Sequence, residues 1–286
     1  MAVELVIPRS FDPAQAAHWF GPWKSSEEEP ELRLRLPKGA FLQPTGVALL
    51  AAGIARRQQR GWKTTLVHDA GAEDTYRHLQ RIDFFEELGV TPPKDFQRHE
   101  PAGGFVPLKR IVSLKVAREL ADRSIECLEH QLKDVAVSPL RMARFIFEEL
   151  GANVVQHSGA AETGFGIVQA FPERKRLELA FADAGVGFRR SLERNPELEG
   201  RIADDGEALQ LALSKGLTGG IPLKQNVGMG LGLLQDFADR VGGDLWIASG
   251  DALLRRRTAV GNVRTNTLSS TAGWQGSWLC LDAPMA

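Results

Sequence analysis

Apolar and polar positions follow two different periods in the first hundred residues of the chain. A period of two, clearest in ELRLRLP, predicts half-buried strands, whereas apolar positions at helical spacing that end at a glycine predict helices. Strands that alternate with helices predict a small α/β domain. The predicted strands cover 4–8, 31–37 and 64–69, and the predicted helices cover 44–61 and 74–89.

The pattern changes beyond a stretch rich in proline and glycine, and we place a domain boundary near residues 100–108. Two amphipathic helices are predicted next, and the second begins at Ser138 with a proline at its first helical position. Two strands joined by the polar turn PERK follow. We therefore expect an α/β (α+β) protein with two domains, 1–105 and 106–286. The first of the two helices covers 110–132, and the two strands cover 163–171 and 176–183.

Composition narrows the class of protein only modestly. The chain has 286 residues, of which 43% are hydrophobic and 25% are charged, as in an ordinary globular protein. Its net charge of −1 gives no reason to expect a nucleic-acid-binding surface. Two cysteines, no N-terminal signal sequence and no apolar run of about 18 residues predict a reducing, cytoplasmic setting without membrane contact.

The stretch FEELGANVVQHS carries three polar side chains on the predicted second helix. Glu149, Asn153 and His157 recur every four residues, which places them on one face of a helix. Such a stripe either lines a polar site or is a solvated face of an amphipathic helix. The residues expected to face the core are Phe145, Ile146 and Leu150.

Two glycine-rich motifs follow. In DAGVG, Asp183 ends a strand and could accept a hydrogen bond from an exocyclic amine, while Gly185 and Gly187 let the backbone approach a flat ligand. An ordinary Asp-Gly turn is the alternative. In GMGLGLLQDFADRVGG (228–243), glycines lead into a helix whose free N–H groups and dipole favour phosphate.

These three motifs, in this order, closely resemble the GHKL ATPase superfamily of gyrase, chaperone, histidine kinase and MutL type. The Glu-x-x-x-Asn-x-x-x-His helix comes first, Asp-x-Gly-x-Gly follows about 30 residues later, and Gly-x-Gly-x-Gly-Leu comes about 40 residues after that. The resemblance covers roughly residues 110–286. It implies a Bergerat-type α/β sandwich, in which a mixed sheet is covered by helices on one face, with ATP and Mg²⁺ as ligands.

The resemblance also implies a role for each matching residue. Asn153 would bind Mg²⁺, Glu149 would be the general base that activates a hydroxyl or water, and Asp183 would recognise adenine. His157 matches a position that is often basic in the family, and support of helix packing is its alternative role. The other implied nucleotide-binding residues are Gly185, Gly187, Gly228, Gly230, Leu231 and Gly232.

The resemblance and the residue pattern also suggest roles for three further segments of the second half. Residues 214–227 would form a mobile lid with Lys215 and Lys224 as candidate phosphate contacts, although solvated loop lysines are the alternative. Residues 276–282 resemble the last strand of the family's sheet, where Ser277 would support the adenine-recognising aspartate. Residues 251–277 would form a long hairpin or a mobile loop, and their LLRRRT run would bind an acidic group or stay solvated.

Residues 1–100 resemble a STAS domain, the fold of anti-sigma-factor antagonists, and the matching part is 36–90. In that family a hydroxyl in a turn after a strand is phosphorylated by a GHKL serine kinase. Thr45, in QPTG, stands at this phospho-acceptor position. The chain departs from the family pattern because Gln43 and Pro44 occupy the region of the usual aspartate. The alternative role of Thr45 is that of a helix N-cap.

A STAS-like domain joined to a GHKL-like domain implies an ATP-binding regulatory protein of signal transduction. The leading hypothesis is an anti-sigma-type serine/threonine kinase that transfers phosphate from Mg-ATP to Thr45 or to a partner STAS domain. The alternative is an ATP-gated protein-interaction switch with little or no kinase activity.

A histidine kinase is a third hypothesis, because EHQLKD contains His130, but no segment remains for a dimerisation hairpin. The expected partners are ATP or ADP, a STAS or sigma-factor-like regulator and a second copy of the chain, with no nucleic acid and no membrane.

Overall fold

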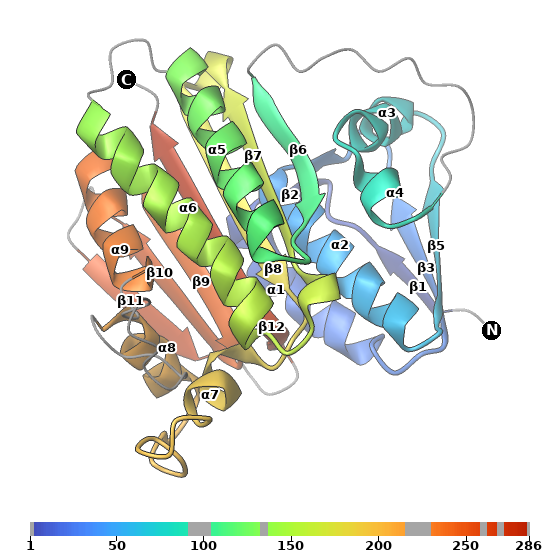
Figure 1. The fold of residues 1–286 in the computed structure, drawn as a ribbon. Helices are drawn as coiled ribbons and strands as arrows, with labels where there is room; N and C mark the ends of the chain where they lie inside the picture. The colour runs from blue at the N-terminus through green and yellow to red at the C-terminus, as the bar shows by residue number, and fades with distance from the viewer. Residues whose placement is uncertain are drawn as a thin grey trace.

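The computed structural model of the chain describes residues 3–90, 104–131, 137–214, 230–257, 262–267 and 272–284. Over these residues the protein is of mixed α/β class (Figure 1). Within the described ranges, none of the helices combines the length and the apolar character needed to cross a membrane.

The N-terminal unit, residues 3–90, is built on a parallel sheet with the strand order β1-β3-β5. The three predicted strands and the predicted helix at 44–61 are confirmed, with ends that differ by at most two residues. The elements are β1 (Val3–Val6), β2 (Ser10–Phe11), α1 (Pro13–Ser25), β3 (Glu31–Leu36), β4 (Phe41–Leu42), α2 (Pro44–Gln59), β5 (Lys63–His68), α3 (Glu73–Arg81) and α4 (Phe84–Glu87).

The prediction of one continuous helix over 74–89 is wrong. The chain breaks into α3 and α4 because Asp83 adopts a left-handed conformation, with φ of 62°. Gly89, which was predicted to end the helix, does follow α4 with φ of +66°.

The described residues from 104 onward form a seven-stranded sheet in the order β11-β10-β9-β12-β8-β7-β6. Each described pair of neighbours is antiparallel, so the expectation of a mixed sheet is wrong. The elements are β6 (Phe105–Arg110), α5 (Leu114–Gln131), α6 (Val137–His157), the short helix η1 (Ala161–Thr163), β7 (Phe165–Phe171), the short helix η2 (Pro172–Arg174), β8 (Arg176–Asp183), α7 (Gly187–Leu192), α8 (Asp205–Leu213), α9 (Gly230–Val241), β9 (Asp244–Gly250), β10 (Ala252–Arg257), β11 (Asn262–Thr267) and β12 (Trp274–Pro284).

Most predicted elements of this unit are confirmed, including the strands at 163–171 and 176–183 and the last strand. The helix expected from residue 110 begins only at Leu114, because the preceding residues pair as strand β6. Of the two alternatives for 251–277, the described part forms a hairpin of β10 and β11. Two arginines of the LLRRRT run have partners in the chain, since Arg256 pairs with Asp239 and Arg255 lies 4.0 Å over the ring of Trp246.

The large sheet is buried on both faces, as strand β8 shows. Leu179 and Phe181 point to the face that α5, α6, α8 and α9 cover, whereas Ala180 and Ala182 point to the face covered by α1 and α2. Figure 1 shows α5 and α6 on one side of the sheet and α2 on the other. The described helices of the C-terminal unit that cover the sheet lie on one face, as expected, whereas α1 and α2 of the N-terminal unit cover the other face. The two predicted domains therefore share a hydrophobic core.

Helix α2 is the element that joins the two units. It contacts β8 and β7 of the large sheet and β5 of the small one, and nearly all of its residues are buried. A helix that is apolar on all sides is expected to be enclosed by protein. Small residues allow this fit: a Cβ on Gly53 would lie 2.2 Å from the ring of Trp23.

Candidate functional site

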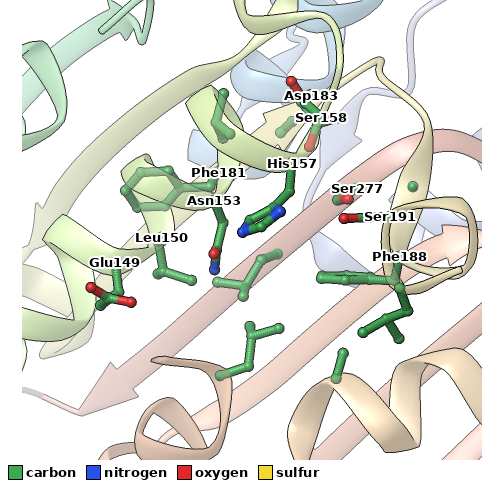
Figure 2. Close-up of a pocket in the computed structure, with 17 residues that line it drawn as sticks. Glu149, Leu150, Asn153, His157, Ser158, Phe181, Asp183, Phe188, Ser191 and Ser277 are labelled. Carbon is green, nitrogen blue, oxygen red and sulfur yellow. The ribbon is translucent and has the colours of Figure 1, made fainter. Parts of the chain in front are cut away.

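A cavity opens on the α6 face of the large sheet and gathers residues from several distant segments (Figure 2). It encloses about 880 Å³ of space between atoms, including its open mouth. The sequence-predicted residues that line it are Glu149, Asn153, His157, Asp183, Gly187, Leu231 and Ser277.

Helix α6 supplies the polar stripe predicted from its spacing. Glu149, Asn153 and His157 all line the cavity, so the prediction that they share a face is confirmed. Ile146 is buried as expected, but the expectation for Phe145 is wrong, because its side chain is 43% exposed. Phe145 directly precedes the buried residues Ile146 and Phe147 but lies on the solvent side of the helix.

The acid–base properties of this stripe reflect partial burial. Burial raises the pKa of the Glu149 carboxyl, and the neighbouring Glu148 carboxylate raises it further. Burial lowers the pKa of His157, and the cation of Arg194 lowers it further. Glu149 therefore holds a proton more readily than an exposed glutamate does, and His157 favours its neutral form.

Asp183 is the most deeply buried acid of the cavity, with 4% of its surface exposed. Burial raises the pKa of its carboxyl to about 6, although hydrogen bonds from the Gly185 amide, at 2.8 Å, and from Ser277 oppose the rise. Ser277 lies directly opposite Asp183 in the pairing of β12 with β8. The expected pairing of this serine with this aspartate is thus present in the structure.

The glycines after Asp183 are required by close approaches within the chain. A Cβ on Gly185 would lie 2.1 Å from the carbonyl oxygen of Ser158, whose oxygen also accepts the Val186 amide at 2.8 Å. Gly187 has φ of +78°. The turn therefore docks against the C-terminal end of α6, which brings Asp183 and the α6 stripe into one cavity.

Sequence reasoning missed several apolar residues of the cavity. Phe181 and Leu279 lie two residues from Asp183 and Ser277 on their strands, so they point to the same face and line the same space. Phe188 lines the cavity from α7. The period-two pattern of the two strands would have identified Phe181 and Leu279, but only the fold brings Phe188 near them.

The phosphate-cradle prediction is only partly covered by the structure. Lys215, Lys224 and Gly228 lie outside the described residues. Helix α9 begins at Gly230, Leu231 lines the cavity and Gly232 is buried. The start of a 12-residue helix therefore lies beside the cavity, and its contact with phosphate stays a prediction.

Thr45 lies on the face of the large sheet opposite to this cavity. It is fully buried on the α2 face of the sheet, where its amide donates a hydrogen bond of 2.9 Å to the Glu178 carboxylate. Glu178 lies on the face of β8 opposite to Phe181 and Asp183. The alternative role as a helix N-cap is wrong, because Gln43 occupies the N-cap position and the helix begins at Pro44.

Over the described part of the chain, no three histidine, cysteine or acidic side chains are grouped so that they could hold a metal ion. Comparison with known proteins adds no assignment: no protein-family model matches the sequence, and no curated protein matches it significantly.

Proposed function

We propose that this chain binds ATP with Mg²⁺ in the cavity and transfers its terminal phosphate to a hydroxyl of a partner protein, as an anti-sigma-type GHKL serine/threonine kinase. In this proposal the large sheet with α5, α6, α8 and α9 is a Bergerat-type domain, and the N-terminal unit is STAS-like. One observation carries the proposal: residues of three separate GHKL-like motifs line one cavity.

The cavity suits the adenine part of the nucleotide. Asp183 offers a buried carboxylate, and the apolar side chains of Phe181 and Leu279 offer surfaces for a flat ring. A carboxylate with a pKa of about 6 is mostly ionised at pH 7, so it can accept a hydrogen bond from the adenine amine. The start of α9 would face the phosphates.

The metal-binding part needs only one protein ligand in this proposal. The amide oxygen of Asn153 is a hard donor, and Mg²⁺ usually completes its shell with phosphate oxygens and water. When bound, the ion would neutralise charge on the phosphates. Glu149, one turn away along α6, would accept the proton of the attacking hydroxyl as that oxygen bonds to the terminal phosphorus and the bond to ADP breaks.

The position of Thr45 bears on the choice of acceptor. Its side chain is fully buried, and it lies on the opposite side of the large sheet from Glu149. Transfer to Thr45 within this arrangement would require the N-terminal unit to leave the sheet. We therefore favour a hydroxyl of a partner protein over self-phosphorylation.

Titration calorimetry with ATP, with and without Mg²⁺, tests the binding step. We expect Asn153→Ala to abolish the tightening by Mg²⁺ and Asp183→Asn to weaken binding at least tenfold, while Gln156→Ala changes neither. Gln156 is a matched control because it is an exposed position of the same helix. Wild-type protein that binds no ATP would refute the proposed function.

Turnover then separates the kinase from the ATP-gated switch. The shared core of the two units supports the switch as a second candidate, because nucleotide binding could alter their docking. We expect the wild type to release phosphate from ATP slowly, and Glu149→Gln to bind ATP but not turn it over. Tight binding without any turnover in the wild type would favour the switch.

A further inference from the structure

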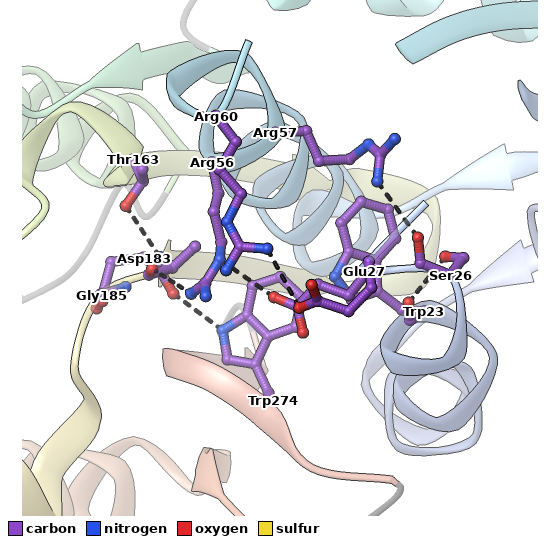
Figure 3. A network of polar contacts seen from close by, with 12 residues as sticks. Trp23, Ser26, Glu27, Arg56, Arg57, Arg60, Thr163, Asp183, Gly185 and Trp274 are labelled. Atoms are coloured by element: carbon purple, nitrogen blue, oxygen red, sulfur yellow. Dashed lines mark hydrogen bonds and ion pairs between the residues drawn. The ribbon is translucent and has the colours of Figure 1, made fainter. Parts of the chain in front are cut away.

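The two peptide groups that follow Asp183 form three hydrogen bonds with side chains from other segments (Figure 3). The indole N–H of Trp274 donates to the Asp183 carbonyl at 2.9 Å, and Arg56 donates from Nη1 to the Ala184 carbonyl at 2.9 Å. The Ala184 amide donates to the Thr163 hydroxyl at 3.1 Å. These contacts fix the direction in which the turn presents the Asp183 carboxylate.

The Arg56 donor belongs to the N-terminal unit. Arg56 lies on α2, and its Nε is 3.1 Å from a carboxylate oxygen of Glu27, which follows α1. Both side chains are only 12% exposed. Burial lowers the pKa of Arg56, whereas the charge of Glu27 raises it. A buried ion pair of this kind holds its geometry because either charge alone would be costly to bury.

The Trp274 donor is also tied to the N-terminal unit, although it lies on β12. Its ring centroid is 5.8 Å from that of Phe20 and 6.3 Å from that of Trp23, both on α1. Displacement of α1 and α2 would therefore remove the Arg56 contact and the packing that orients the Trp274 indole. In this way the N-terminal unit determines the geometry of a turn in a cavity that none of its own residues lines.

We propose that Arg56 is a positioning residue for the Asp183 turn, so that docking of the N-terminal unit and recognition of the nucleotide base are energetically coupled. This proposal rests on the proposed function, since the base is the ligand of Asp183. Coupling is reciprocal: nucleotide that binds the aligned turn stabilises the docked unit, and a protein that draws α1 or α2 away weakens nucleotide binding. Binding of a partner to the N-terminal unit would then regulate the site.

Base selectivity separates positioning from a general loss of stability. ITP carries a carbonyl in place of the adenine amine, so the ratio of ATP affinity to ITP affinity reports how well Asp183 is aimed. We expect Arg56→Met to lower this ratio roughly fivefold, as for the loss of one well-placed hydrogen bond. Arg56→Lys keeps a cation and a donor, so it should recover part of the ratio.

Arg60→Met is the matched control. Arg60 lies four residues further along the chain, and its guanidinium contacts Glu28 at 3.3 Å and the ring of Trp62 at 4.7 Å rather than the turn. We expect it to leave the ATP-to-ITP ratio unchanged. Trp274→Phe removes the indole N–H but keeps an aromatic ring, and it should lower the ratio in the same direction even if Arg56→Met does not fold.

Hydrogen exchange in nucleotide-free protein gives a second readout of the same contact. We expect the amides of Gly185 and Val186 to exchange faster in Arg56→Met than in the wild type or Arg60→Met. ATP binding by the wild type with an unchanged ATP-to-ITP ratio in both turn variants would overturn the positioning role alone. A wild type that binds neither nucleotide would refute the proposed function and, with it, the coupling.

Discussion

The buried Glu178 should make the stability of this protein depend on pH in a way that one substitution removes. Glu178 is 2% exposed between α2 and the large sheet, with a backbone hydrogen bond from Thr45 at 2.9 Å and the Cys280 sulfur 3.7 Å away. Burial raises the pKa of its carboxyl to about 7, against an ordinary value of 4.5. The native state therefore holds this proton more tightly than the unfolded state does.

The sign of the effect follows from proton linkage. The stability due to the protonated Glu178 is fully present below pH 4.5 and is lost as the pH rises through about 7. At about 1.4 kcal/mol per pKa unit, the complete loss amounts to roughly 3 kcal/mol. Glu178→Gln keeps an acceptor for the Thr45 amide and cannot ionise. The variant should therefore lose no stability through ionisation of residue 178 as the pH rises from 4.5 to about 7.

Chemical denaturation of both proteins, followed by tryptophan fluorescence between pH 5 and 8.5, measures this effect. Burial lowers the pKa of His78 to about 4, which makes stability fall as the pH drops through 6.5, and this contribution cancels in the difference between the two proteins. We expect the stability advantage of Glu178→Gln to grow as the pH rises from 5 to about 7 and to level off above that value. Identical pH profiles would refute the reasoning.

Three further predictions address packing, thiol chemistry and the cavity. Gly53→Ala should destabilise the protein by about 2 kcal/mol, because the added methyl group overlaps an indole ring of α1. Gly104→Ala, which has open space around it, should not destabilise the protein, and thermal unfolding compares the two variants. Burial raises the pKa of Cys127 to about 11 and that of Cys280 well above its ordinary value. Both thiols should therefore resist alkylation at pH 8 until denaturant is added, and rapid labelling of native protein would contradict this. Affinity for ATP should fall as the pH drops through about 6, where the Asp183 carboxylate takes up a proton, and calorimetry at pH 5 and 7.5 should detect the change; pH-independent affinity would argue against Asp183 as the base-contacting group.

Much of the local structure was readable from the chain itself. The period of two marked β3, and the four-residue spacing of Glu149, Asn153 and His157 placed them on one face of α6, as the cavity confirms. Such predictions succeed because the direction of a side chain depends on the geometry of its own helix or strand. The break between α3 and α4 escaped prediction, since the left-handed conformation of Asp83 leaves no periodic signal.

The relation between the two halves was decided by tertiary structure alone. Periodicity shows that a face is apolar, but it does not say which surface covers it. The contacts of α2 with the large sheet join residues far apart in the chain: Thr45 to Glu178 across 133 positions and Arg56 to Ala184 across 128. Whether Thr45 is an accessible hydroxyl, and whether Arg56 is a surface cation or part of the Asp183 turn, depends on how two separately patterned surfaces pack. That packing is a property of their three-dimensional shapes, which no local pattern encodes.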